Sequence, residues 1–90
     1  MKTAHVIVEG RVQGVSFRDY THRQAHQLNL TGWVRNNRDG TVEAVFKGAE
    51  KDLLSMLEWL WQGSPHSRVA NVRTKEPATE EIFTTFEVRY

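Results

Sequence analysis

The chain has 90 residues, 39% of them hydrophobic, which is typical of one folded domain with a single modest core. The 12 Lys and Arg residues nearly balance the 11 Asp and Glu residues, so a broad nucleic-acid-binding surface is disfavoured and any anion site must be local. The absence of cysteines excludes disulfides and thiolate chemistry, and no apolar run suits a signal peptide or a membrane span, so we expect a cytoplasmic monomer with no membrane partner.

The first two elements predicted along the chain are a strand and a helix. Residues 4–12 alternate between apolar and other side chains, which is typical of a half-buried strand. Apolar side chains recur at helical spacing over residues 17–28. Ser16, followed three residues later by Asp19, predicts a capped helix that begins near Phe17.

The middle of the chain predicts a hairpin. The segments TGWVRNN at 31–37 and TVEAVFKG at 41–48 both have the alternation of strands. Between them lies NNRDG, whose Asn, Asp and Gly residues tolerate the positive φ of a tight turn. The inward positions of the second strand are predicted to be Val42, Ala44 and Phe46.

A second helix and two more strands complete the pattern. The helix covers residues 49–63, a strand covers 68–77 and ends at Pro77, and the last strand covers 82–90. The predicted inward positions are Leu53, Met56, Leu57 and Leu60 on the helix, Ala70 and Val72 on the first strand, and Ile82, Phe86, Val88 and Tyr90 on the last.

This order of elements predicts an α+β fold, the ferredoxin-like split βαβ sandwich. A mainly antiparallel five-stranded sheet would carry both helices on one face, because the crossovers are right-handed. We expect residues 1–90 to form a single domain whose outer sheet face is comparatively polar. That outer face lacks the aromatic pair of an RNA-recognition sheet, which disfavours nucleic acid as a partner.

The segment GRVQGVSFR at 10–18 is a candidate anion site. Backbone N–H groups around Gly14, together with the start of the helix, can form a concave nest that carries partial positive charge. Arg18 in the first helical turn can place its planar fork over the same hollow. The alternative is a plain strand-to-helix turn in which Arg18 is a solvated surface residue, and short glycine motifs do not decide between the two.

A second candidate is Asn36, an amide near the end of the predicted second strand. Alternation places it on the same side as Gly32 and Val34. It can therefore sit beside the anion loop if the two strands share a sheet, and an amide both donates and accepts hydrogen bonds. The alternative is that Asn36, like Asn37, only shapes the hairpin turn.

Other candidates have plainer explanations. His22 and His26 stand four apart on the first helix, but no third ligand is evident, so a solvated helix face is favoured and no metal is expected. Trp59 and Trp61 with Met56 have the spacing of a helix core rather than of a ligand box.

Two motifs resemble a known family. GRVQGVSFR at 10–18 and GWVRNNRDGTVE at 32–43 are similar to the two signature motifs of the acylphosphatase family. The WLWQGSP helix end and the closing FEVRY are also similar to that family, so the resemblance covers essentially the whole chain. It implies a metal-independent enzyme without cofactors that hydrolyses small acyl phosphates to a carboxylate and inorganic phosphate.

The resemblance also implies roles for individual residues. Arg18 matches the phosphate-binding arginine, Asn36 the water-orienting asparagine, and Thr41 a threonine that helps to hold that asparagine. Asn37 stands where members commonly have threonine. The backbone amides that would bind the phosphate belong to Gln13, Gly14, Val15, Ser16, Phe17 and Arg18.

The implied reaction requires little general acid–base catalysis by side chains. An acyl phosphate is already activated, so positioning and charge stabilisation suffice, and a substrate phosphate oxygen can take the proton of the attacking water. The same domain also occurs inside larger proteins, so a weakly active phosphate-binding module is the alternative to the freestanding enzyme that we expect. The sequence does not specify the acyl half of the substrate.

Overall fold

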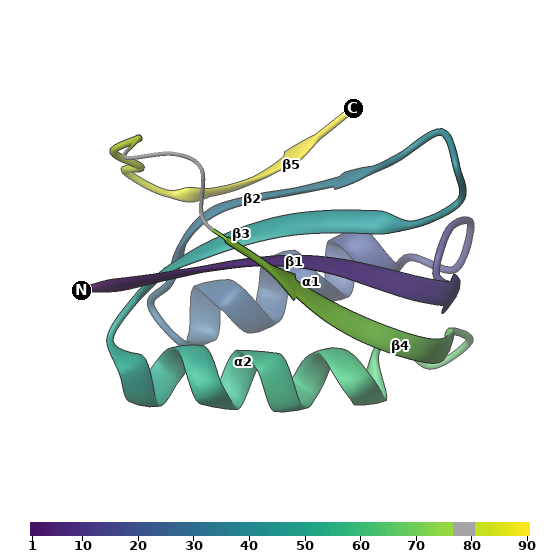
Figure 1. The fold of residues 1–90 in the computed structure, drawn as a ribbon, viewed down its shortest axis with the longest axis horizontal. Helices are drawn as coiled ribbons and strands as arrows, with labels where there is room; N and C mark the ends of the chain where they lie inside the picture. The colour runs from purple at the N-terminus through teal and green to yellow at the C-terminus, as the bar shows by residue number, and fades with distance from the viewer. Residues whose placement is uncertain (77–80) are drawn as a thin grey trace.

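The computed structural model describes residues 1–76 and 81–90 and contains all the predicted elements (Figure 1). Pro77, the predicted end of one strand, lies outside these residues. The elements are β1 (Lys2–Arg11), α1 (Phe17–Gln27), β2 (Thr31–Asn36), β3 (Val42–Gly48), α2 (Glu50–Gln62), β4 (Arg68–Lys75) and β5 (Phe86–Arg89).

The five strands form one sheet in the order β4-β1-β3-β2-β5. All neighbours are antiparallel except β2 and β5, which run parallel. Helix α1 lies against β2 and β5, and α2 lies against β4, β1 and β3, so both helices cover the same face (Figure 1). This arrangement confirms the predicted ferredoxin-like fold. No helix of the described residues is both long and apolar enough to cross a membrane.

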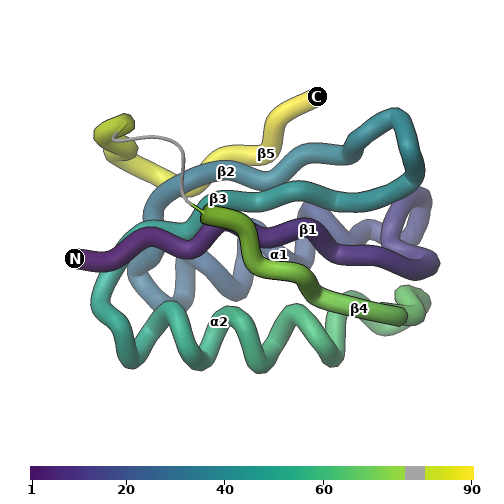
Figure 2. Tube along the Cα trace, in the orientation of Figure 1, coloured from purple at the N-terminus to yellow at the C-terminus, as the bar shows by residue number. Residues whose placement is uncertain are grey.

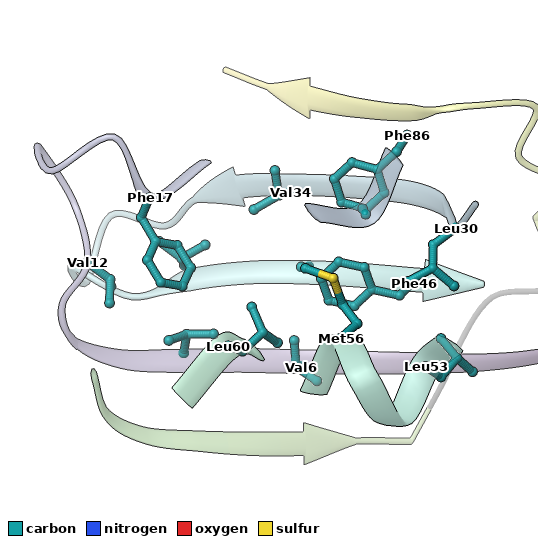
Figure 3. Close-up of a cluster of buried hydrophobic side chains, with 14 of the residues drawn as sticks. Val6, Val12, Phe17, Leu30, Val34, Phe46, Leu53, Met56, Leu60 and Phe86 are labelled. Atoms are coloured by element: carbon teal, nitrogen blue, oxygen red, sulfur yellow. The ribbon is translucent and has the colours of Figure 1, made fainter. Parts of the chain in front are cut away.

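The core lies between the sheet and the two helices (Figure 3). The inward positions of β3 are buried as predicted, and the Phe46 and Phe86 rings stack with centroids 5.3 Å apart. Helix α1 contributes a buried hydroxyl at Thr21, which donates to the Phe17 carbonyl oxygen at 2.8 Å and is therefore not left unpaired in the core. The labelled core residues are Val6, Val12, Phe17, Leu30, Val34, Phe46, Leu53, Met56, Leu60 and Phe86.

The inward positions of β4 differ from the prediction. Val72 packs against the core as predicted, but Val69 rather than Ala70 is its partner there, and Ala70 is exposed. The pairing with β1 shifts at Glu9 and Gly10, so that Ala70 is an extra residue in the ladder. A bulge of this kind reverses the alternation on one side of it, and simple period-two counting does not detect it.

Three exposed residues also correct the prediction. Ile82 is 83% exposed, because β5 begins only at Phe86, where its pairing with β2 starts. Tyr90 follows the end of β5 and is fully exposed. Trp61 is 53% exposed, because it is the residue after Leu60 on α2 and therefore points about 100° away from the buried stripe.

The outer face of the sheet is less polar than expected. Val45 is buried there, and Glu43 is only 7% exposed. The Glu43 carboxylate contacts His5 Nε2 at 2.5 Å and accepts a hydrogen bond from Arg35 Nη2 at 3.0 Å. The Trp33 ring meets the His5 ring edge-on with centroids 6.0 Å apart. The buried Glu43 carboxylate on this face is therefore paired with His5 and Arg35.

One end of the sheet brings together distant segments. The loop after β1 and the turn between β2 and β3 lie at the same end, and β5 runs toward it (Figures 1 and 2). Two side chains join these segments: Gln13 bonds to the carbonyl oxygen of Asn37, and Arg18 bonds to that of Arg89. This end of the fold holds both predicted site motifs.

Candidate active site

The loop that leads into α1 has the curled backbone expected of an anion nest. Gly14 has φ of 73° and Ser16 has φ of 59°, both in the left-handed region. Serine rarely adopts this conformation, and such positions cluster at functional sites. Left-handed residues alternating with others turn successive N–H groups toward one hollow.

The helix begins at Phe17 as predicted, but Ser16 does not cap it in the predicted way. Its side chain makes no capping hydrogen bond, and Asp19 is simply an acidic residue in the first turn. The left-handed backbone of Ser16 explains this, because a side-chain cap normally requires an extended residue at that position. The start of α1 therefore keeps unpaired N–H groups that an anion can satisfy.

Arg18 projects from the first turn of α1 into this region. Its Nη1 donates to the Arg89 carbonyl oxygen at 3.0 Å, and its guanidinium carbon lies 4.7 Å from the centre of the Tyr90 ring. Within the described part of the chain, no carboxylate forms an ion pair with Arg18. Both of its partners are uncharged groups, so the guanidinium charge is available to an anion.

Asn36 ends β2 on the helix-covered side of the sheet, as alternation predicted. Its half-buried side chain lines the same hollow as Arg18. Its Oδ1 is buried and has no hydrogen-bond partner among the described residues. A buried acceptor without a partner costs free energy, and a bound water that donates to it would remove that cost.

The hollow itself has a volume of about 290 Å³ and is more polar than apolar. Four of the predicted phosphate-binding residues line it, together with Asn36, so the structure brings the two motifs together. The lining also includes Val88 and Tyr90, which were not predicted as site residues, because nothing in the sequence pattern shows that β5 pairs with β2. The lining residues are Val12, Gly14, Ser16, Phe17, Arg18, Asp19, Asn36, Val88 and Tyr90.

Two predicted phosphate-binding residues do not line this hollow. The side chain of Gln13 points to the hairpin turn, where its Nε2 donates to the carbonyl oxygens of Asn37 and Thr41. Val15 is buried in the core, and its carbonyl oxygen accepts a hydrogen bond from Ser64 Oγ at 2.8 Å. The Gln13 side chain therefore anchors the loop to the hairpin turn, and the buried Val15 side chain and its carbonyl oxygen anchor it on the other side.

Thr41 has a different partner from the one expected. Its Oγ1 accepts from Asn37 Nδ2 at 3.0 Å and donates to Asp39 Oδ1 at 2.6 Å, so Thr41 holds Asn37 rather than Asn36. The Asn37 side chain reaches the Thr41 hydroxyl from its place in the turn. The hydrogen bonds from the Thr41 side chain and backbone hold the pKa of Asp39 below its usual value.

The remaining histidines of α1 have ordinary surroundings. The ring centroids of His22 and His26 lie 6.3 Å apart, and His22 packs 6.1 Å from the Phe86 ring. Across residues 1–76 and 81–90, no group of three or more His, Cys, Asp or Glu side chains is placed to hold a metal ion.

Comparison with known proteins gives one consistent result. The acylphosphatase family model matches residues 4–88. An acylphosphatase from Syntrophobacter fumaroxidans is 46% identical over 89 residues, which is 99% of this chain and 92% of the relative. The crystal structure of acylphosphatase from Bacillus subtilis has a TM-score of 0.94 and 39% identity, and the match covers 100% of both chains.

A larger protein contains a similar unit. The crystal structure of T. kodakarensis HypF matches with a TM-score of 0.87 and 34% identity over 100% of this chain but only 12% of HypF. The two kinds of match differ in how much of the other protein they cover: the matches that cover nearly all of both chains are to acylphosphatases. The family model, the near-complete coverage and the identity together show that this chain belongs to the acylphosphatase family.

Proposed function

We propose that this chain hydrolyses the carboxyl–phosphate bond of acyl phosphates to a carboxylate and inorganic phosphate. The observation that carries this proposal is the shared hollow, which Arg18, Asn36 and the curled backbone at Gly14 and Ser16 all line. Arg18 has no acidic partner among the described residues, so its charge is not already neutralised. A guanidinium and a nest of N–H groups suit a phosphoryl dianion.

In this mechanism the phosphoryl group is held by Arg18 and by backbone amides of residues 13–18. The Asn36 carboxamide holds a water, which attacks phosphorus in line with the leaving oxygen. The new bond joins the water oxygen to phosphorus, and the bond to the acyl oxygen breaks with its electron pair on the carboxylate. The water proton passes to a phosphate oxygen. No side-chain base is then required.

Turnover of a small aryl acyl phosphate in the presence of a chelator tests this proposal. We expect the unsubstituted chain to be active without added metal, and Asn36→Ala to lose about 10²–10³-fold in kcat, the typical cost of one preorganised group. Arg18→Ala should lose more in kcat/KM, because it also binds the ground-state phosphate. If the unsubstituted chain is no faster than these folded variants, the enzymatic proposal fails.

The alternative is a phosphate-binding module with little activity, favoured only by the match to a small part of HypF. Such a module would bind inorganic phosphate through Arg18 without turning over an acyl phosphate. Calorimetric titration with phosphate, carried out beside the turnover assay, separates the two functions. Binding without turnover would establish the module.

We further propose that the chain acts as a monomer in the cytoplasm on a small molecule rather than on nucleic acid. The nearly balanced charge supports the last point, since nucleic-acid binding requires an excess of Lys and Arg on one surface. Gel filtration would test the oligomeric state, and elution at twice the mass of the chain would contradict it.

A further inference from the structure

The side chain of Gln13 connects two parts of the proposed site and has no role in the mechanism above. Gln13 directly precedes Gly14 in the anion loop and is half-buried. Its Nε2 lies 2.7 Å from the carbonyl oxygen of Asn37 and 2.9 Å from that of Thr41. These partners are 24 and 28 residues away in sequence, so the bonds tie the loop to the turn between β2 and β3.

The chemistry of the two partners fixes how this amide is oriented. A carbonyl oxygen only accepts hydrogen bonds, so the nitrogen end of the Gln13 carboxamide must face both, and each of its two hydrogens has its own acceptor. The same carbonyls already close the hairpin, through Asn37 N to Thr41 O at 2.8 Å and Gly40 N to Asn37 O at 3.3 Å. Gln13 thus occupies their remaining acceptor capacity.

Asn36 depends on this arrangement for its place. It precedes Asn37 directly and pairs with Val42 in the β2–β3 ladder. No described residue bonds to its Oδ1, so the position of that atom depends on the backbone that carries Asn36 and on the packing of the side chain. Gln13 holds the backbone that follows Asn36, at Asn37, to the loop that carries Gly14 and Arg18.

We propose that Gln13 is a positioning residue, whose side chain sets the distance between the Asn36 carboxamide and the anion loop. This inference rests on the proposed function, since the distance matters only if the water held by Asn36 attacks a phosphate held by the loop. In-line attack is sensitive to such distances, and a misplacement of about 1 Å can cost about 10²-fold in rate.

Gln13→Met tests this role, because methionine has a similar length and no N–H donor. We expect kcat to fall about 10–100-fold, while inhibition by inorganic phosphate changes little because Arg18 and the loop amides remain. Gln27→Met, on the exposed last turn of α1, is the matched control and should leave both parameters unchanged. In an Asn36→Ala background, Gln13→Met should cause little further loss.

Two kinetic outcomes would overturn the proposal. One is full kcat in folded Gln13→Met, and the other is the same fold-loss with and without Asn36, which would mean that the two residues act independently. A measurement on the unsubstituted chain does not depend on the folding of any variant. The Gln13 side-chain amide hydrogens should exchange with water more slowly than those of Gln27, and equal exchange would refute the two hydrogen bonds.

The same experiments distinguish this inference from the function on which it rests. If the unsubstituted chain hydrolyses no acyl phosphate, the proposed function fails, whatever Gln13 does. Slow exchange would then leave Gln13 as a structural tie between loop and turn and refute its role as a positioning residue.

Discussion

Arg18 has partners that a substrate can displace. A neutral carbonyl oxygen of Arg89 and the face of the Tyr90 ring hold it at the edge of the hollow. Charge-assisted hydrogen bonds to a phosphate are stronger than a bond to a neutral carbonyl, so a bound dianion would recruit the remaining donors of the fork. The Arg18 guanidinium is thus preorganised at the hollow while its positive charge stays unpaired among the described residues.

Gly14→Ala tests the curled loop at a single residue. A Cβ at this position meets no atom within 4 Å, so the expected cost comes only from the positive φ and is on the order of 1 kcal/mol. That cost lowers the melting temperature by roughly 4–8 °C in a domain of this size. We expect kcat/KM to fall at least about 10-fold, because relaxation of the loop misdirects amides that face the phosphate.

Gly40→Ala is the control for this prediction. Gly40 also has a positive φ, of 92°, with nothing within 4 Å of an added Cβ, so the change in melting temperature should be similar. Its amide does not belong to the anion loop, so inhibition by inorganic phosphate should stay much closer to that of the unsubstituted chain than it does in Gly14→Ala. Equal losses of this inhibition in the two variants would contradict a specific role for the loop at Gly14.

Single residues of the site were predictable to different degrees. The positive φ at Gly14 and the side of the sheet that carries Asn36 followed from glycine chemistry and from alternation, and the structure confirms both. The hydrogen-bond partner of Thr41 could not be predicted from the sequence, because the shape of the turn decides whether its hydroxyl reaches Asn36 or Asn37. The phosphate-binding roles remain predictions.

At the scale of whole strands, Glu43 links β3 to its neighbours on the outer face. Burial raises the pKa of the Glu43 carboxyl, but hydrogen bonds from His5 and Arg35 and the charge of Arg35 outweigh it and leave the pKa below 4.5. A carboxylate with a lowered pKa stabilises the fold above its unfolded-state pKa, and this contribution is lost as the pH falls through the lower folded-state pKa.

Glu43→Gln should therefore destabilise the fold at neutral pH, because it removes the charge that His5 and Arg35 contact. The difference in free energy of unfolding between the two chains should shrink as the pH falls below the ordinary carboxyl pKa of 4.5. Urea unfolding at a series of pH values measures it. A difference that grows as the pH falls would have the wrong sign.

The elements show where pattern analysis succeeds and where it stops. Helix and strand periods identified all seven elements and the inward face of β3. The bulge opposite Gly10 moved Val69 inward in place of Ala70, since an inserted residue leaves no mark on composition. The last strand was predicted too long, because its length depends on how far β2 extends beside it.

For the molecule as a whole, the layer between sheet and helices should dominate stability. Leu60→Ala removes a fully buried side chain and should lower the free energy of unfolding by about 2–5 kcal/mol. Leu54→Ala on the same helix, at a residue that is 61% exposed, should change it by less than about 0.5 kcal/mol. Denaturant unfolding compares the two variants, and equal effects would contradict the assigned core.

The arrangement of one sheet with two helices on the same face was predictable because its order of elements allows few topologies, whereas the walls of the hollow were not. Val88 and Tyr90 reach the site only because β5 lies parallel to β2, at the far edge of the sheet from β4. That pairing is a property of the assembled sheet and not of any local segment. The site residues that belong to the two motifs could therefore be predicted from the sequence. The residues that β5 and the chain end add to the site, Val88 and Tyr90, could not.

A crystal structure with phosphate bound is the most direct test of the central claim that one hollow holds the anion between the loop, Arg18 and Asn36. We expect a phosphate bound by backbone amides of residues 13–18 and by the Arg18 guanidinium, with the Asn36 carboxamide bonded to a water beside it. A phosphate bound elsewhere, or Asn36 turned away from the ion, would contradict the claim.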